Sequence, residues 1–272
     1  MGTLKVGIIG GSGLNDPKIL HEKTEKSMTT PYGEPSSVLT LGQIEGVDVV
    51  LLARHGKGHD INPSQINYRA NIWALKAEGC THILATNACG SLRQEYKVGD
   101  LIILDQFIDR TFLRHNTFYS GNKEDPKGVL HIPMGHPFCE ETRKVMIAAT
   151  KELAFDFHEA GTMVIIEGPR FSTKAESKMF ALWGGDLVGM TTVPEVTLAK
   201  EAGICYSSVA MVTDYDAWKD EDHVTVEQVY QTLKKNADKA TKVLIKAVSL
   251  LSKRDWTKVI EANKKMISSG IM

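Results

Sequence analysis

Short apolar runs alternate along this chain with longer segments in which apolar residues recur at helical spacing. The runs are rich in Val, Ile and Leu and predict buried strands at Val6–Ile9, Val47–Ala53, Ile83–Thr86, Leu101–Leu104, Thr162–Ile166, Leu187–Gly189 and Ile204–Met211. Continuous apolar strands of this kind are typical of a sheet that is covered on both faces. Helices are predicted between them at Gln65–Glu78, Glu140–Leu153, Lys174–Trp183 and Pro194–Ala202, with helix-ending glycines at Gly79 and Gly203.

The longest helical pattern begins at Thr225, where Gln228 completes a capping box, and its apolar stripe continues to Leu244. Residues 111–128 are polar and include Gly121 and Pro126, which predicts a surface excursion and not a domain boundary. Strands that alternate with helices, without a repeat or a linker, predict an α/β fold in a single domain over residues 1–272.

The composition narrows the class of protein. The chain has a net charge of −1, so no overall field recruits nucleic acid or anionic lipid, and any phosphate contact must be local. Its longest apolar runs are of strand length, far below the roughly 20 residues of a membrane span, and the amino terminus has no signal-peptide pattern. The cysteines lack the spacing of a zinc site or a redox dithiol, and Cys80, Cys89 and Cys205 are expected in the core. We therefore expect neither a nucleic-acid nor a membrane partner, and a reducing cytosol as the compartment.

Two segments suggest a site that holds an anion next to an acid. Thr191 lies at a predicted strand-to-helix junction, where free backbone N–H groups can hold an oxyanion. Asp214 and Asp216 follow an apolar strand, at a spacing that lets both face one side if the backbone stays extended. Like charges held close raise one pKa, so one carboxyl can stay protonated and act as an acid. A helix N-terminus and a solvated acidic turn would explain the same residues.

Three other strand ends carry groups that suit phosphate. The first is the glycine-rich segment Gly7–Gly13 with the Ser12 hydroxyl, the second is Arg54-His55 with His59 close behind, and the third is the segment Asn87–Ser91. Each alone fits a tight turn or a solvated loop equally well. Since ligands of open α/β sheets collect at the carboxyl ends of the strands, their agreement predicts a phosphate site.

Six motifs in one order resemble a known family. Gly-Ile-Ile-Gly-Gly-Ser-Gly-Leu, Leu-Leu-Ala-Arg-His-Gly, Ala-Cys-Gly-Ser-Leu, Ile-Glu-Gly-Pro-Arg-Phe-Ser, Met-Thr-Thr-Val-Pro-Glu and Thr-Asp-Tyr-Asp extend from residue 7 to residue 216. The chain resembles the 5′-methylthioadenosine phosphorylases within the trimeric purine nucleoside phosphorylase family. The resemblance implies a mixed central β-sheet flanked by helices and a homotrimer. It also implies a pentosyltransferase of purine and methionine salvage, in the cytoplasm with the nucleus as a second candidate. The reaction would convert methylthioadenosine and inorganic phosphate, the co-substrate, to adenine and methylthioribose-1-phosphate, without a metal or an organic cofactor.

The resemblance also assigns roles to particular positions. Phosphate would be held by Ser12, Arg54, His55, Asn87, Ala88 and Thr191. Asp214 and Asp216 would be the catalytic pair that addresses N7 and the 6-amino group of the base. The nucleoside would also contact His59, Phe171, Met190, Val226, Val229 and Tyr230, with Ser172 and Val226 at positions that tune specificity. His131 and Met272 would reach the active site of a neighbouring subunit.

Two positions depart from the usual pattern of the family. Ser12 and Asn87 stand where threonine is common, so adenosine and 2′-deoxyadenosine are expected as additional substrates. A 6-oxopurine nucleoside phosphorylase is the main alternative, but the related 6-oxopurine enzymes have Asn where this chain has Asp214. A non-catalytic adenosine-binding protein is the second alternative, and such a protein would have no use for Arg54, His55 and Thr191.

Overall fold

The computed structural model describes residues 4–11, 17–123, 125–219 and 226–272, with backbone alone at positions 17, 226 and 228–230. Its strands are β1 (Lys5–Gly10), β2 (His21–Lys26), β3 (Leu39–Ile44), β4 (Val47–Ala53), β5 (His82–Ser91), β6 (Leu101–Ile103), β7 (Gln106–Arg110), β8 (Phe157–His158), β9 (Thr162–Ile166), β10 (Leu187–Gly189) and β11 (Cys205–Asp214). Its helices are the short 3₁₀ turn η1 (Pro17–Ile19) and α1 (Tyr68–Ala77), α2 (Glu140–Glu152), α3 (Lys174–Leu182), α4 (Thr192–Glu201), α5 (Val226–Leu251) and α6 (Thr257–Gly270).

All described strands belong to one mixed sheet, as the resemblance implies. The order β2-β3-β4-β1-β5-β10-β9-β7 forms its main path, and β11 pairs with β5 and β6 off this path, with β8 beside β6. β1 pairs in parallel with β4 and β5, and β5 pairs in parallel with β11. The carboxyl ends of these central parallel strands therefore meet at one edge.

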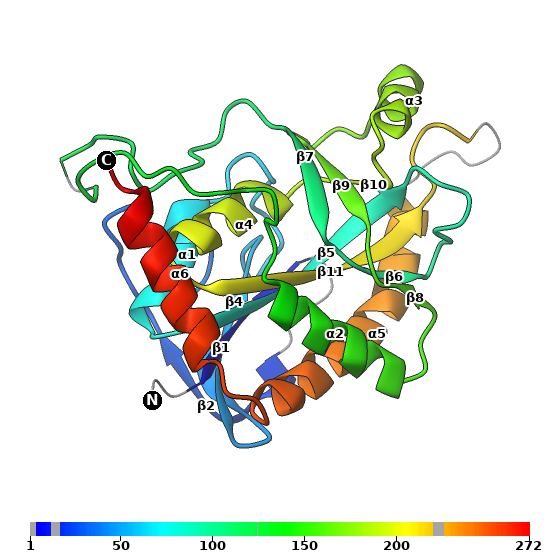
Figure 1. Ribbon diagram of the computed structural model, residues 1–272. Helices are drawn as coiled ribbons and strands as arrows, with labels where there is room; N and C mark the ends of the chain where they lie inside the picture. Colours follow the sequence, from blue (N-terminus) through cyan, green and yellow to red (C-terminus); the bar gives the residue numbers. More distant parts are fainter. Residues whose placement is uncertain (1–3, 12–16, 124, 220–225) are drawn as a thin grey trace.

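Helices cover the sheet on both faces, which confirms the prediction from the apolar strands (Figure 1). Neighbouring residues of one strand enter different cores, because successive side chains point to opposite faces. Ile9 of β1 packs in the core under α1 and α4, whereas Ile8 packs in the core under α2 and α5. No described helix combines the length and hydrophobicity that crossing a membrane requires.

Every predicted strand and helix is present in the described part of the chain. Gly79 and Gly203 end α1 and α4 with φ of +80° and +76°, the left-handed conformation expected of helix-ending glycines. In α4 the backbone at Val193 is not helical, so the regular turns begin at Pro194 as predicted. The capping box predicted for Thr225 and Gln228 lies outside the described residues and side chains.

The pattern missed β2, β3, β7, β8 and α6. It also ended two strands too early, at Thr86 and Met211, whereas β5 and β11 continue to Ser91 and Asp214. β5 continues through Asn87–Ser91, because β11 runs beside it in parallel as far as Asp214. The interpretation of Asn87 as part of a turn after a strand is therefore wrong. The surface excursion is present, with no strand or helix in residues 111–123 and 125–128, but Arg114 and Phe118 turn inward from it.

Candidate active site

A cavity of about 390 Å³ opens where β1, β4, β5, β10 and β11 end. Ten of the predicted site residues line it: Arg54, His55, His59, Ala88, Phe171, Ser172, Met190, Thr191, Asp214 and Asp216. Ser12 and the side chains of Val226, Val229 and Tyr230 lie outside what the structure describes. Asn87, His131 and Met272 are not among the lining residues. The fold therefore brings most of the residues predicted from the sequence together at one concave site.

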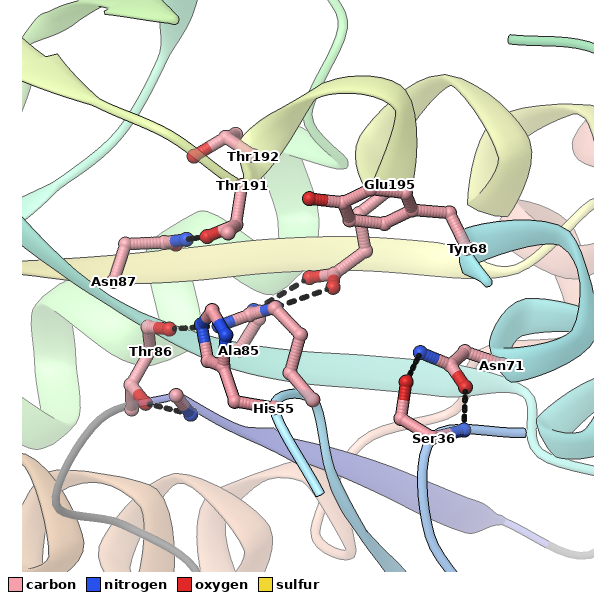
Figure 2. Close-up of polar contacts among 12 residues, drawn as sticks. Ser36, His55, Tyr68, Asn71, Ala85, Thr86, Asn87, Thr191, Thr192 and Glu195 are labelled. Atoms are coloured by element: carbon pink, nitrogen blue, oxygen red, sulfur yellow. Dashed lines mark hydrogen bonds and ion pairs between the residues drawn. The ribbon is translucent and has the colours of Figure 1, made fainter. Parts of the chain in front are cut away.

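Arg54 reaches the cavity from the end of β4 as part of a buried ion pair. Its Nε and Nη2 donate to the two carboxylate oxygens of Glu195 on α4, each at 2.7 Å. Its Nη1 donates to the Thr86 carbonyl at 2.8 Å, and Figure 2 shows the dashed contacts that end on Glu195 and Thr86. Burial opposes the charge, but Glu195 outweighs it and raises the pKa of Arg54. Arg54 is thus a fixed cation whose charge is largely balanced before any anion arrives.

His55 follows Arg54 and presents a neutral ring. Burial, together with the Arg54 charge, lowers its pKa to about 4. The neutral ring donates from Nδ1 to the Ile61 carbonyl at 2.8 Å, which leaves Nε2 as an acceptor. The His59 ring lies against it with 4.6 Å between the centroids. His55 can therefore accept a hydrogen bond from a protonated phosphate oxygen, and it adds no positive charge of its own.

Thr191 lies between β10 and α4, at the helix start predicted from the sequence. Its hydroxyl makes no capping hydrogen bond to α4. Instead it accepts a hydrogen bond from Asn87 Nδ2 at 2.9 Å, a contact drawn in Figure 2. Asn87 Oδ1 in turn accepts from the Ser208 hydroxyl on β11. Asn87 is therefore buried behind Thr191, where it acts on the cavity through that residue.

Asp214 and Asp216 line the cavity together, although the backbone between them does not stay extended as predicted. Asp216 has φ of +49°, and its N–H donates to Asp214 Oδ1 at 2.8 Å. Asp214 Oδ2 accepts from the Thr213 hydroxyl at 2.7 Å. Gly90 allows this packing, because an added Cβ would lie 2.9 Å from Asp214 Oδ1.

Burial is the first cause that raises the pKa of both Asp214 and Asp216. The charge of Asp216 adds to the effect at Asp214 as its smallest named cause. The direction of both shifts agrees with the sequence argument, but desolvation and not mutual repulsion is their main cause. Asp216 Oδ2 and Ser172 Oγ are buried and make no hydrogen bond of ordinary geometry in the described part of the chain, although the hydroxyls of Ser177 and Ser172 lie near enough to oppose the rise in the Asp216 pKa. Both atoms therefore have bonding capacity for a bound molecule.

His131 and Met272, assigned to a neighbouring subunit, belong to two segments that pair with each other, and neither residue lines the cavity. Val129 and Met272 exchange backbone hydrogen bonds at 3.2 and 3.0 Å, and the His131 N–H donates to the Gly270 carbonyl at 2.9 Å. The Met272 side chain is 81% exposed. The chain thus presents the two residues on one exposed edge.

Sequence reasoning missed the charged side chains that hold the site together. Glu195 is fully buried within an almost wholly buried helix, and the Tyr206 hydroxyl also donates to it at 2.7 Å. Arg114 extends inward from the surface excursion and donates to the Met190 and Val193 carbonyls at 2.6 and 2.7 Å. A buried carboxylate on an apolar helix requires a cation, and this need was the one signal that could have paired Glu195 with Arg54.

The fold and this arrangement of strand ends agree with comparisons to known proteins. The family model described as "Phosphorylase superfamily" matches residues 5–249, so the chain belongs to this superfamily of phosphorylases. Within it the chain groups with the S-methyl-5′-thioadenosine phosphorylases. The enzyme of that name from Xenopus tropicalis is 58% identical over 272 residues, which cover 99% of this chain and 97% of the relative.

Solved structures give the same grouping. Methylthioadenosine phosphorylase from Schistosoma mansoni in complex with adenine has 47% identity and a TM-score of 0.97, with 99% of both chains covered. A double variant of the adenosine/methylthioadenosine phosphorylase from that organism has 46% identity and a TM-score of 0.95, with 99% of both chains covered. In that variant a serine and an asparagine are replaced by threonine, and it was also crystallised with adenine.

Proposed function

We propose that this protein cleaves S-methyl-5′-thioadenosine with inorganic phosphate, releasing adenine and methylthioribose-1-phosphate. One observation carries the proposal: a single cavity holds two carboxyls with raised pKa, one buried and one partly buried, and, on other strand ends, the Thr191 hydroxyl and the Arg54 guanidinium. The relatives named above support the same reaction. The proposal includes no metal or organic cofactor.

Asp214 is the general acid in this proposal. Adenine is a poor leaving group until N7 is protonated or strongly hydrogen-bonded, and a carboxyl whose pKa is raised can supply that proton. Asp216 then accepts a hydrogen bond from the 6-amino group through Oδ2, which is buried without a described partner. Phe171 and Met190, which also line the cavity, contact the purine and the ribose.

Phosphate binds at the other strand ends and captures the sugar. As the bond from C1′ to N9 breaks, the ribosyl centre gains positive charge, which a phosphate held below it stabilises. Thr191, the backbone at Ala88 and the Arg54 N–H groups that do not bond Glu195 or Thr86 hold this anion, together with Ser12. Since Glu195 balances Arg54, hydrogen-bond geometry contributes more to phosphate binding than net charge does.

Adenosine and 2′-deoxyadenosine are further substrates in this proposal. Ser12 and Asn87 replace the threonines that are common in the family, and a solved relative carries a name that includes both adenosine and methylthioadenosine. Val226, Val229 and Tyr230 are proposed to surround the 5′ group, and Ser172 and Val226 to tune specificity.

The assembly we propose is a homotrimer in which His131 and Met272 reach a neighbouring site. Phe112 and Trp183 are 72% and 46% exposed and flank Arg110. Their ring centroids lie 5.0 and 5.4 Å from its guanidinium carbon. Exposed aromatic surface of this kind is typical of an interface. Light scattering that finds a fully active monomer would contradict the shared site. The compartment we propose is the cytosol, with the nucleus second.

Adenine release tests the reaction directly. Methylthioadenosine, adenosine, 2′-deoxyadenosine and inosine are each incubated with and without phosphate, and base release is followed by absorbance. We expect release from the three adenine nucleosides only when phosphate is present. Preferred use of inosine would support the 6-oxopurine alternative. Tight nucleoside binding without release would support the non-catalytic alternative.

A further inference from the structure

Two neighbouring serines in the middle of β11 are both fully buried but differ in their partners. Ser208 donates to Asn87 Oδ1 and lies 3.2 Å from the Ala85 carbonyl. Ser207 points to the opposite face of the sheet, and its hydroxyl has no hydrogen-bond partner in the part of the chain that the structure describes. Ser208 is therefore part of a series of hydrogen-bonded polar side chains, the polar chain, and Ser207 is not.

The polar chain runs from Ser208 through Asn87 to Thr191. The hydroxyl of Ser208 donates to the amide oxygen of Asn87, and the amide nitrogen donates to Thr191 Oγ1 at 2.9 Å. All three side chains are buried, with exposed fractions of 0%, 2% and 7% along the chain. A hydrogen bond inside the protein is stronger than one at the surface. The hydrogen bond from Ser208 therefore fixes which end of the Asn87 amide faces Thr191.

This direction determines what the Thr191 hydroxyl can do. An amide oxygen held by Ser208 turns the amide N–H₂ toward Thr191, so the threonine oxygen accepts from Asn87. Its own proton then points elsewhere, and it makes no cap to α4. Since Thr191 also lines the cavity, that proton is available to an anion there. A reversed amide would instead accept the Thr191 proton and take it away from the cavity.

We propose that Ser208 is a positioning residue for phosphate, which through Asn87 holds the Thr191 hydroxyl as a donor toward the cavity. The inference rests on the proposed phosphate-dependent reaction and deepens it. Ser208 itself touches neither phosphate nor nucleoside in this account.

Two neighbouring alanine variants separate positioning from general damage. Ser208→Ala should raise the KM for phosphate about fivefold, as the loss of one neutral hydrogen bond in such a chain implies. Its KM for methylthioadenosine should change less than about twofold, because the lost hydrogen bond orients a phosphate ligand and not a nucleoside ligand. Ser207→Ala removes an equally buried hydroxyl from the same strand and should change neither constant. Ser208→Thr keeps the hydroxyl and should retain the phosphate KM of the wild-type protein.

A double-variant cycle tests the route through Asn87. In an Asn87→Ala background the amide is gone, so adding Ser208→Ala should produce no further rise in the phosphate KM. A full additional rise would mean that Ser208 acts by another route and would overturn the proposal. Equal rises in both KM values for Ser208→Ala would also overturn it, because that pattern indicates damage to the whole site.

Calorimetric titration with inorganic phosphate reads the same effect without turnover. Wild-type protein that binds phosphate but releases no adenine would contradict the proposed reaction. The phosphate affinities of the two serine variants would then still decide the positioning role. Equal phosphate affinity in the Ser208→Ala and Ser207→Ala variants would refute the positioning role alone. Wild-type protein without measurable phosphate affinity would refute both.

Discussion

The Glu195 carboxylate accepts hydrogen bonds from Arg54 Nε and Nη2, each at 2.7 Å, and both side chains are fully buried. This two-point contact joins the end of β4 to the first turn of α4 through two residues that are 141 positions apart in the sequence. It fixes the orientation of a guanidinium at the phosphate end of the cavity. The residue predicted to bind phosphate is therefore also part of the framework.

Arg54→Ala should destabilise the protein by about 3–5 kcal/mol, because it leaves the Glu195 charge buried without its partner. The double change Arg54→Met with Glu195→Met should recover much of that loss, because it removes both charges. Urea unfolding measures both effects. Arg170→Ala is the matched control: Arg170 also makes a two-point contact, with Glu176, but its side chain is 66% exposed. Its loss should cost less than about 1 kcal/mol. A stable Arg54→Ala variant would mean that water or nearby groups solvate Glu195.

Asp214→Asn should shift preference from 6-amino toward 6-oxo purines. An amide at position 214 can donate to O6 and still reach N7, but it cannot supply a carboxyl proton to N7. We expect adenine nucleosides to lose about 2–4 kcal/mol of transition-state stabilisation, measured as kcat/KM for adenosine and inosine. The Thr213 and Asp216 contacts to the carboxylate are local, so the fold should persist. Full adenosine activity in this variant would remove Asp214 from the role of acid.

Gly90→Ala should reduce activity on adenine nucleosides without unfolding the protein. Its new methyl group would lie 2.9 Å from Asp214 Oδ1 and 3.1 Å from Asp216 Cβ, so both carboxyls must shift. A misplacement of about 1 Å at a reacting group can cost about 100-fold in rate, so this smaller shift should cost less than that. Gly135→Ala is the control, because a methyl group there meets nothing within 4 Å. Equal kinetics for the two variants would show that the carboxyls adapt freely.

The free energy of unfolding should fall as the pH drops from about 6.5 to about 4, in part because of His82. Burial lowers the His82 pKa from 6.5 to about 4, so the unfolded chain takes up a proton before the folded protein does. The contribution of this residue is present above pH 6.5 and is lost as the pH falls through that window. His82→Phe should reduce the pH dependence by up to about 3 kcal/mol. Identical urea midpoints for both proteins across this range would contradict the assignment.

The alternation of apolar strands and helices was enough to predict the architecture, but polar and very short elements escaped it. Every residue of β2 is exposed, so its sequence His-Glu-Lys-Thr-Glu-Lys has no buried face for a pattern to reveal. β8 has two residues, and α6 has no fully buried residue. These elements are held by pairing and packing with distant parts of the chain, which a local pattern does not contain.

The same limit applies to the site. Arg54, Thr191 and Asp214 stand at strand ends, so their convergence followed from the fold. Glu195 stands between buried apolar residues on a helix that has almost no polar face, and its role depends on a guanidinium that only the folded chain places beside it. The burial of Asn87 also depends on tertiary structure, because its amide is buried only when β5 continues past Thr86 beside β11.

β11 carries both Ser208 and Asp214, and it is hydrogen-bonded to β5 along nearly its whole length and to β6 on its other edge. Amide hydrogens of such a central strand exchange with solvent only when the whole protein unfolds. His55 and His59, in contrast, lie where the chain leaves β4 and turns. Adding substrate should therefore slow deuterium uptake around residues 55–63 and leave β11 unchanged. We thus expect one wall of the site to persist as long as the fold itself, and the other to exchange its amide hydrogens without global unfolding.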